Sequence, residues 1–387
     1  MGEKQEYAPF RVGAARCDSY EPSAVEEAVE RAVQASGGWP ESCCSEEVLL
    51  KANLLAPRPP EDAVTTHPEV LRGVVRSLRR RGAGRIRIGD NPGYIYASQK
   101  ELLLERTGMK RLGEDEDVPV GTLSDEGVEE VPIPGGRVLS RARVSTRILR
   151  SRYLVNVAKL KTHVETEMTG CLKNLFGIAD TQTRKRAHQS RDTSHLVHGI
   201  LDLFTLARPL FHVLDAVVAM EGNGPSHGSP KRVGWILAGP NAPSIDLVAA
   251  VSMGYSNPFD IPLLRTAAER GLGPRSLDEV DLRGANWEEL PTAGFRRASG
   301  LVRFIPTPLR GFAHRWVALR PQLERSACVR CRVCQEVCPV DAISWDDGPV
   351  VDSNRCVQCL CCHEMCPTGA MKAAANPLAR WVQGMRS

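Results

Sequence analysis

The sequence predicts an α/β protein in which an open, mostly parallel sheet carries helices on both faces, followed by a small α+β domain rich in cysteine. Two observations lead to this prediction. Strand-like and helix-like stretches alternate over residues 8–290, as they do where helices connect parallel strands. Near the C-terminus, eight of the thirteen cysteines form one repeated pattern. At 387 residues, the chain is long enough for two or three domains.

Apolar patterning, caps and breakers place the individual elements. Strands are predicted within residues 10–17, 47–55, 85–90, 152–160, 210–220 and 233–239. Helices are predicted at 24–36, with Ser23 as the N-terminal cap, and at 67–82, 194–208 and about 245–253. The acidic stretch at about 113–137 is rich in glycine and proline and is predicted to be a solvated insertion, with a hairpin as the alternative.

Composition narrows the class of protein. The formal net charge of +4 is small for this length and gives no reason to expect nucleic acid as a partner. No run of about 18 apolar residues is present, so no membrane span is predicted. The first residues have neither an apolar signal core nor a twin-arginine motif, which favours a cytoplasmic protein.

The cysteine pattern is the strongest signal in the chain. It reads C-x2-C-x2-C-x3-C-P twice, and each cysteine of the second run lies 28 residues after its counterpart (356 against 328). In this spacing three thiolates bind one cubane cluster, while the fourth, before its proline, binds the other. The first [4Fe-4S] cluster is therefore predicted to be held by Cys328, Cys331, Cys334 and Cys366. The second is predicted to be held by Cys356, Cys359, Cys362 and Cys338.

The segment around these cysteines, residues 322–373, resembles a bacterial-type two-cluster ferredoxin. Between the two runs, residues 343–352 predict a small hairpin with an Asp-Gly turn. Cys361 is extra and is predicted not to be a ligand. Structural zinc also uses C-x2-C pairs, but the triple spacing with trailing prolines favours iron–sulfur clusters.

Polar residues gather where the predicted strands of the larger domain end. Four strands are followed by polar pairs: Lys51 with Asn53, Asp90 with Asn91, Lys159 with Lys161, and Asp215 with Glu221. In open parallel sheets the ligand crevice lies outside the carboxyl ends of the strands. A single lysine after a strand is ordinarily just a solvent-exposed residue where the chain leaves the sheet. Four such segments together predict a polar crevice.

The two lysines after residue 158 make this prediction more specific. Strand alternation places Lys159 and Lys161 on one face, and a core cannot accept two unpaired ammonium groups, so that face must open to a cavity or an anion. The following residues, 162–175, are predicted to be a helix whose polar stripe forms a wall of the site. That stripe comprises Thr162, Thr166, Thr169 and Lys173. Cys171 falls on the apolar stripe and is predicted to pack in the core, with a reactive thiolate as the alternative.

Three stretches together resemble the family called domain of unknown function 362. They are "VLLKANLL" with the "TTHPEVLRGVVRSLRRRGAGRIRIGDNPG" that follows, "NVAKLKTHVETEMTGCLKNLFG", and "DAVVAMEGNGPSHGSPKRVGWILAG" leading to Asp246. The resemblance covers residues 8–255, and family members are often fused to two-cluster ferredoxin modules. It implies a fold and a site, with His163 and Asn174 inside the distinctive central block, but no substrate. Where relatives usually carry a small residue, this chain has Cys171.

Together these features predict an iron–sulfur oxidoreductase that passes electrons through two [4Fe-4S] clusters to a small anionic substrate. Lys159, Lys161 and Lys173 would bind the anion and stabilise its developing charge, and His163 or a lysine would supply a proton. The predicted substrate-binding residues are Lys51, Asn53, Asp90, Thr162, Thr169, Asn174, Asp215 and Glu221.

The predicted organisation is an α/β domain at 8–290, an Arg- and Pro-rich linker at 291–321 that packs the two domains together, the ferredoxin-like domain at 322–373, and a tail at 374–387. A ferredoxin or a reductase would donate the electrons, and the oligomeric state is left open. Two other functions also fit the sequence: an electron-transfer subunit that docks a partner redox enzyme, and a non-redox α/β enzyme with structural clusters.

Overall fold

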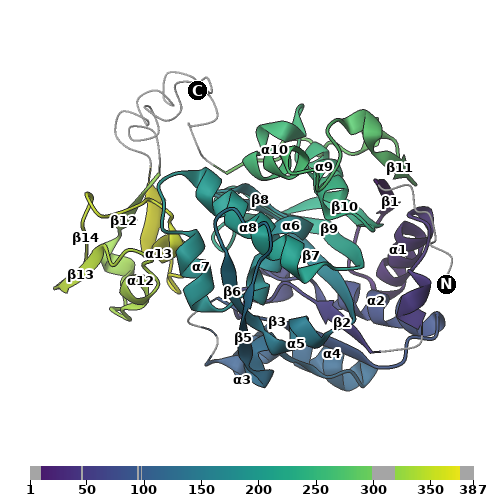
Figure 1. Cartoon of the computed structure of the whole chain (residues 1–387), viewed down its shortest axis with the longest axis horizontal. Coiled ribbons are helices and arrows are strands. Elements are labelled where there is room, and N and C mark those ends of the chain that lie inside the picture. The colour runs from purple at the N-terminus through teal and green to yellow at the C-terminus, as the bar shows by residue number, and fades with distance from the viewer. Residues whose placement is uncertain (1–9, 45–46, 94–95, 97, 299–318, 375–387) are drawn as a thin grey trace.

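The computed structural model describes residues 10–44, 47–93, 96, 98–298 and 319–374, and its centre is a nine-stranded sheet (Figure 1). The strands are β1 (Arg11–Arg16), β2 (Val48–Lys51), β3 (Ile86–Asp90), β4 (Val120–Thr122), β7 (Tyr153–His163), β8 (Glu167–Thr169), β9 (Phe211–Glu221), β10 (Ser229–Gly239) and β11 (Asp281–Arg283). They are ordered β11-β1-β10-β9-β7-β2-β3-β4, with β8 paired to β7.

The sheet is mostly parallel, as predicted. Strands β9, β7, β2, β3 and β4 are parallel neighbours, and β11 is parallel to β1. Only β10, between β1 and β9, and the short β8 pair in the antiparallel sense among the strands of this sheet in the described ranges. The carboxyl ends of β2, β3 and β7 therefore lie side by side at one edge.

Helices cover both faces of the sheet, which confirms the predicted fold class. One core contains side chains from α1 (Pro22–Ala35), α2 (Pro68–Arg80), α3 (Lys100–Arg106) and α4 (Met109–Glu116). The other contains side chains from α5 (Thr146–Arg150), α6 (Cys171–Asn174), α7 (Thr181–Ala187), α8 (Thr193–Ala207), α9 (Ala242–Ser252) and α10 (Pro262–Glu269). Strand β7 contributes Val155 and Val157 to the first core and Leu154 and Ala158 to the second, as a strand's two-residue period requires.

The helix predicted over residues 162–175 is wrong. Strand β7 continues to His163, the chain reverses, and β8 pairs back on β7 with Lys161 opposite Thr169. Thr162, Val164, Thr166 and Thr169 are β-branched and suit extended backbone better than helix, which explains this outcome. Only the short α6 remains helical, and its Cys171 is fully buried in the core, as predicted.

Two further local expectations differ from the structure. Helix α1 begins at Pro22, earlier than predicted, and its cap is Glu21, whose carboxylate accepts from the Ala24 N–H at 2.9 Å. Proline favours the first turn of a helix, so it moves the start ahead of Ser23. The acidic stretch at about 113–137 contains β4, an edge strand of the main sheet, and β5 (Val128–Pro132), which pairs with β6 (Arg141–Ser145).

The C-terminal residues 320–374 form a small separate unit, called the ferredoxin-like module below, beside α7 (Figure 1). Its first and last strands, β12 (Arg320–Leu323) and β15 (Met371–Ala374), pair in the antiparallel sense. The predicted hairpin is present as β13 (Ile343–Asp346) and β14 (Gly348–Val351), and the two short helices are α12 (Val333–Glu336) and α13 (Cys361–Glu364). Most of the predicted linker and nearly all of the predicted tail lie outside the described residues.

Candidate functional site

A cavity of about 130 Å³ lies between the strand ends of the α/β domain and the ferredoxin-like module. Three parts of the chain form its wall. The strand ends supply Lys51, Asn53, Asp90, Asn91 and Lys161. The segment that follows β7 supplies Thr169, Lys173, Asn174, Phe176, Arg184, Lys185 and His188, among others. The module supplies Val337, Cys361, Glu364 and Met365.

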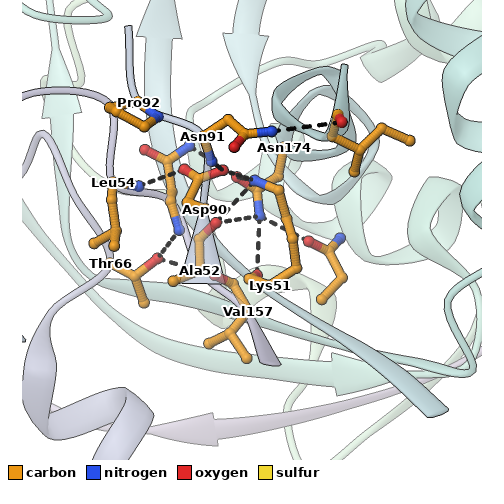
Figure 2. Close-up of polar contacts among 12 residues, drawn as sticks. Lys51, Ala52, Leu54, Thr66, Asp90, Asn91, Pro92, Val157 and Asn174 are labelled. Carbon is orange, nitrogen blue, oxygen red and sulfur yellow. Dashed lines mark hydrogen bonds and ion pairs between the residues drawn. The ribbon is translucent and has the colours of Figure 1, made fainter. Parts of the chain in front are cut away.

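At the ends of β2 and β3, a buried ion pair forms part of this wall (Figure 2). Lys51 Nζ lies 2.6 Å from Asp90 Oδ1, and the other oxygen of Asp90 accepts from the Leu54 N–H at 2.6 Å. Burial lowers the pKa of Lys51, and the adjacent carboxylate of Asp90 opposes that shift. A side chain at Gly177 would place its Cβ 2.8 Å from Asp90 Oδ1, so the pair needs a glycine above it.

Asn174 bonds to the strand ends of the wall and to Asn156 of β7, which lies outside the cavity lining. Its Oδ1 accepts from Asn53 Nδ2 at 2.9 Å and from Lys51 Nζ at 3.2 Å, while its Nδ2 donates to Asn156 Oδ1 at 2.7 Å (Figure 2). Asn174 is buried, so each of these bonds is made away from bulk solvent. Residues from β2, β7 and α6 are thus held in one network, which fixes the position of the Lys51 ammonium group.

Lys161 is the most unusual cation of the cavity. Its ammonium group, on a side chain that is 1% exposed, donates to Asn53 Oδ1 at 3.0 Å and to the Val64 carbonyl at 2.8 Å. Both partners are neutral, and no carboxylate in the described part of the chain lies within ion-pair distance of it. Burial lowers its pKa to about 7, against the opposing charge of Glu364, so Lys161 can exchange a proton near neutral pH.

Other groups add positive charge and an unused hydroxyl to the wall. Lys173 Nζ lies 5.6 Å from the centre of the Phe176 ring, and Arg184 donates to the Pro92 carbonyl at 3.1 Å. Thr169 Oγ1 is buried with no hydrogen-bond partner among the described residues. A cavity lined by several cations and a free hydroxyl is suited to bind a small anion.

His163, predicted as a proton donor, lies just behind the wall. Its Nδ1 accepts from the backbone N–H groups of Glu165 (3.1 Å) and Thr166 (3.3 Å), which places the proton of the neutral ring on Nε2. That Nε2 lies 3.7 Å from Glu364 Oε2 of the ferredoxin-like module. Burial lowers the pKa of His163 well below its usual value, so the ring is neutral and faces a carboxylate of the cavity wall.

A second buried histidine lines the cavity itself. His188 Nδ1 lies 3.3 Å from Glu165 Oε2. Burial opposes a charge on this ring, but the Glu165 carboxylate outweighs burial and raises the pKa of His188. The pKa values of the two buried histidines are therefore shifted in opposite directions.

The structure does not bring Lys159 and Asp215 to the cavity. Lys159 Nζ lies 2.9 Å from Asp215 Oδ2 and 2.7 Å from Tyr20 Oη, and Tyr20 Oη donates to Asp215 Oδ1 at 2.8 Å. The backbone N–H of His67 donates to the same carboxylate at 3.0 Å. These groups satisfy one another around Lys159 and Asp215, which are both fully buried, so neither predicted ligand is available to a substrate.

Two more predicted ligands also lie outside the cavity wall. Thr162 Oγ1 donates to the Met220 carbonyl and accepts from the Gly224 N–H, each at 3.3 Å. Glu221 accepts from both the backbone N–H and the side chain of Arg296, at 2.9 and 2.8 Å. Thr162 therefore joins β7 to the end of β9 and the loop after it, and Glu221 joins the end of β9 to Arg296. The correction follows from the antiparallel strand β8, which replaces the predicted helix and turns Thr162 away from Thr169 and Lys173.

Several wall residues were not predicted. Arg184 and Lys185 belong to the basic run of α7, which in the sequence looks like a solvated helix face. Glu364 and Cys361 come from the module, and their contribution depends on how the two domains pack. Cys361, the extra cysteine next to Cys362, was the one feature of the sequence that pointed to a wall residue in the module.

The eight repeat cysteines gather around two small pockets. One is lined by a first cysteine set, Cys328, Cys331, Cys334 and Cys366. The other is lined by a second cysteine set, Cys338, Cys356, Cys359 and Cys362, together with Cys361. Among the described residues, no three Cys, His, Asp or Glu side chains come close enough to hold a single metal ion. Four thiols around each small pocket fit the ligand set of a cubane cluster.

Comparison with known proteins identifies the larger domain. The model of the family described as domain of unknown function (DUF362) matches residues 48–251, more than half of the chain. The chain belongs to this family. In this DUF362 protein, a 4Fe-4S dicluster domain matches residues 327–370, so the C-terminal module is of the iron–sulfur ferredoxin type.

One curated relative and two solved structures are similar to this DUF362 protein. A thylakoid-associated protein of Synechocystis sp. is 27% identical over 322 residues, which cover 79% of this chain and 95% of that protein. The lactate racemase apoprotein from Thermoanaerobacterium thermosaccharolyticum has a TM-score of 0.38 at 13% identity, covering 62% of this chain. A protein from Thermotoga maritima has a TM-score of 0.37 at 14% identity, covering 57%. The matched region spans 56% of each of these two structures.

One further property concerns the membrane. Within the ranges that the structure describes, none of the helices is sufficiently long and apolar to cross a bilayer.

Proposed function

We propose that this DUF362 protein is an iron–sulfur oxidoreductase that reduces a small anion held in the cavity. One observation carries the proposal: the cavity and the second cysteine set share helix α13. Cys361 and Glu364 line the cavity, and Cys362, between them, lines the second cysteine pocket. A ligand in the cavity would therefore sit next to the backbone that holds one cluster, within the same short helix.

The two cysteine sets are the proposed cluster ligands. Cys328, Cys331, Cys334 and Cys366 would hold the first cluster, and Cys338, Cys356, Cys359 and Cys362 the second. When bound, such clusters supply single electrons at low potential. A cytoplasmic ferredoxin or reductase would be the donor.

The cavity's size and charge define the class of ligand. An engineered cavity of about 150 Å³ in another protein holds benzene, so about 130 Å³ suits a molecule of roughly six non-hydrogen atoms. Lys161, Lys173 and Arg184 favour an anion with more than one charge, and Thr169 offers one more hydrogen bond. A short dicarboxylate meets these requirements.

Each polar group of the wall would have a separate task. Lys173 and Arg184 would hold the anion by charge-assisted hydrogen bonds. Lys161, with its pKa at about 7, would carry the proton delivered to the ligand as negative charge develops there. His163 would act as a positioning residue, because its Nε2–H has no hydrogen-bond partner among the described residues and faces Glu364 Oε2 at 3.7 Å, where it would orient that carboxylate.

The burial of the cavity's lysines favours an enzyme over an electron-transfer subunit. A docking subunit needs only an exposed cluster site, such as the first cysteine set, and has no use for buried cations. Here the cationic side chains sit between the two domains, and Lys51 and Lys161 are each 1% exposed. A large partner cannot reach them, whereas a molecule of a few atoms can.

The decisive experiment compares the wild-type protein with a Lys161→Met variant. Both are purified anaerobically, and small molecules released on denaturation are identified by mass spectrometry. The proteins are then reduced with dithionite, freed of excess reductant and mixed with the compound found. The wild type should be reoxidised, as followed by absorbance and electron paramagnetic resonance, while the variant keeps both cluster signals and stays reduced.

A Glu221→Gln variant is the matched control, because Glu221 lies outside the cavity wall and pairs with Arg296. It should be reoxidised like the wild type. Reoxidation of the Lys161→Met variant at the wild-type rate would show that the cavity is not the reduction site. A wild type that binds the compound and stays reduced would mean that the clusters have no redox role in turnover.

A further inference from the structure

Three side chains of the α/β domain contact only one of the two cysteine sets. Lys185 donates to the Glu336 carbonyl, Gln189 to the Pro339 carbonyl at 3.4 Å, and Arg191 to the Cys356 carbonyl at 3.2 Å. Arg191 also donates to the carbonyls of Asn354 at 2.7 Å and Ser353 at 3.4 Å. We call residues 185–191, at the end of α7 and just after it, the clasp segment.

The carbonyls that accept these bonds all belong to loops of the second cysteine set. Glu336 and Pro339 flank Cys338, while Ser353 and Asn354 lead into Cys356. In the described ranges, no side chain of the α/β domain donates a hydrogen bond to residues 327–334 or 366–368, which carry the first set. The two sets are therefore alike in sequence but held differently by the rest of the molecule.

The two sets also differ in exposure. Cys331 of the first set is exposed, and its neighbour Val329 keeps 62% of its surface accessible. In the second set, Cys338 and Cys362 are buried at 8% and 7% exposure. The first set is thus the more exposed of the two, and the second lies next to the cavity.

We propose that the clasp segment raises the reduction potential of the second cluster site above that of the first. Reduction adds one negative charge, and the cations Lys185 and Arg191 stabilise that charge when they lie against the ligand loops. Burial acts in the opposite direction, because a low dielectric disfavours added charge. Without the two cations, the buried second site would therefore have the lower reduction potential. With them, a single electron taken at the exposed site from a reduced one-electron carrier protein moves downhill toward the cavity. No bond changes and no proton moves in that step.

This inference rests on the proposed function only for the presence of two clusters. It adds a direction of electron flow and names the residues that set it. Its test needs no substrate, so the two ideas can fail separately.

The test is a redox titration of the full-length holoprotein, followed by electron paramagnetic resonance. A soluble paramagnetic relaxation agent assigns the signals, because it acts more strongly on the exposed first site. In the wild type, the less accessible cluster should have the higher potential. In the Lys185→Gln/Arg191→Gln double variant, the equilibrium constant for reduction of the less accessible cluster should fall about tenfold, which is 59 mV for a one-electron couple. The accessible cluster should move less than about twofold, or roughly 18 mV on that scale.

Two further variants separate charge from structure. Arg191→Lys keeps the charge and should retain most of the wild-type potential, which a purely structural role of the guanidinium would not predict. Arg330→Gln, on the exposed side where Arg330 pairs with Asp347 at 2.9 Å, should leave the second site unchanged. Iron content and far-ultraviolet circular dichroism check that each variant is folded and loaded.

Either of two results would overturn the inference. In one, the more accessible cluster has the higher potential in the wild type. In the other, the double variant shifts both clusters equally or neither of them. The less accessible cluster could have the higher potential while the cavity ligand fails to reoxidise the reduced protein. That result would support this inference and contradict the proposed function.

Discussion

Two lysines of strand β7, two residues apart, occupy opposite kinds of site. Lys159 is in a closed cluster in which Asp215 and Tyr20 satisfy its ammonium group. Lys161 reaches the cavity and has only neutral oxygens as partners. A buried cation with a carboxylate partner serves the fold, whereas a buried cation without one costs stability and is retained where a ligand supplies the missing charge.

The largest expected effect concerns stability. A Lys159→Met substitution leaves the Asp215 carboxylate charged and fully buried, so the free energy of unfolding should fall by about 3–5 kcal/mol. A Lys161→Met substitution leaves no carboxylate uncompensated but takes the donor from two buried acceptors, Asn53 Oδ1 and the Val64 carbonyl, so that free energy should fall by only about 1–2 kcal/mol. Anaerobic urea titration measures both. Equal losses in the two variants would erase the distinction between the sites.

The next effect concerns the short helix that supplies Lys173 and Asn174 to the open site. Asp246 accepts from the Cys171 and Leu172 N–H groups at 2.6 and 2.9 Å, at the N-terminus of α6. Asp246→Ala should lower the free energy of unfolding by about 2 kcal/mol, because it leaves buried donors without partners. Sulfate, a small anion with two charges, can serve as a probe of the cavity. The same variant should bind sulfate more weakly in calorimetry, since α6 positions part of the cavity wall. Unchanged affinity would mean that α6 does not shape the cavity.

The third effect is a pH dependence that only the open site should have. Burial lowers the pKa of Lys161 to about 7, so its ammonium form is lost as pH rises through that value. Sulfate keeps its charge over this range, and its affinity should fall about tenfold per pH unit above 7, until the pKa of the bound form is reached, and stay level below about pH 6. Lys161→Met should bind weakly with no such slope. A wild-type profile that is flat through pH 7 would contradict the assigned proton site.

The smallest effect concerns Glu221, which was predicted to bind substrate but lies outside the cavity wall. Glu221 pairs with Arg296, whose side chain is 66% exposed. Glu221→Gln should change the free energy of unfolding by less than about 1 kcal/mol, because solvent screens such a pair. Sulfate affinity should match that of the wild type. A clear loss of affinity would place Glu221 back among the binding residues.

The parallel strand ends could be predicted because their signals are local. The apolar runs that form β2 and β3 stop at polar residues, and consecutive parallel strands bring those ends to one edge. Lys51, Asn53, Asp90 and Lys161 therefore line the cavity together. The cysteine spacing is equally local, and the two sets line separate pockets.

The residues that were misplaced depend on distant partners. Nothing near Lys159 in the sequence shows that Tyr20 will cover it, since the two lie 139 positions apart. Apolar spacing over 162–175 fits a helix, but pairing of β8 with β7 satisfies the backbone as extended chain and decides the outcome. Glu364 reaches the cavity only through the packing of two domains, which no periodicity encodes.

The shared wall of the cavity has a consequence for iron supply. Small iron–sulfur and other metal-binding domains gain much of their folding free energy from the metal. If the proposed second cluster is needed for α13 to form, a chain made under iron starvation would lose Cys361, Glu364 and Met365 from the cavity wall together with its proposed source of electrons. On the proposed function, such a molecule would bind the anion only when it is also able to reduce it, so metal loading would control substrate binding.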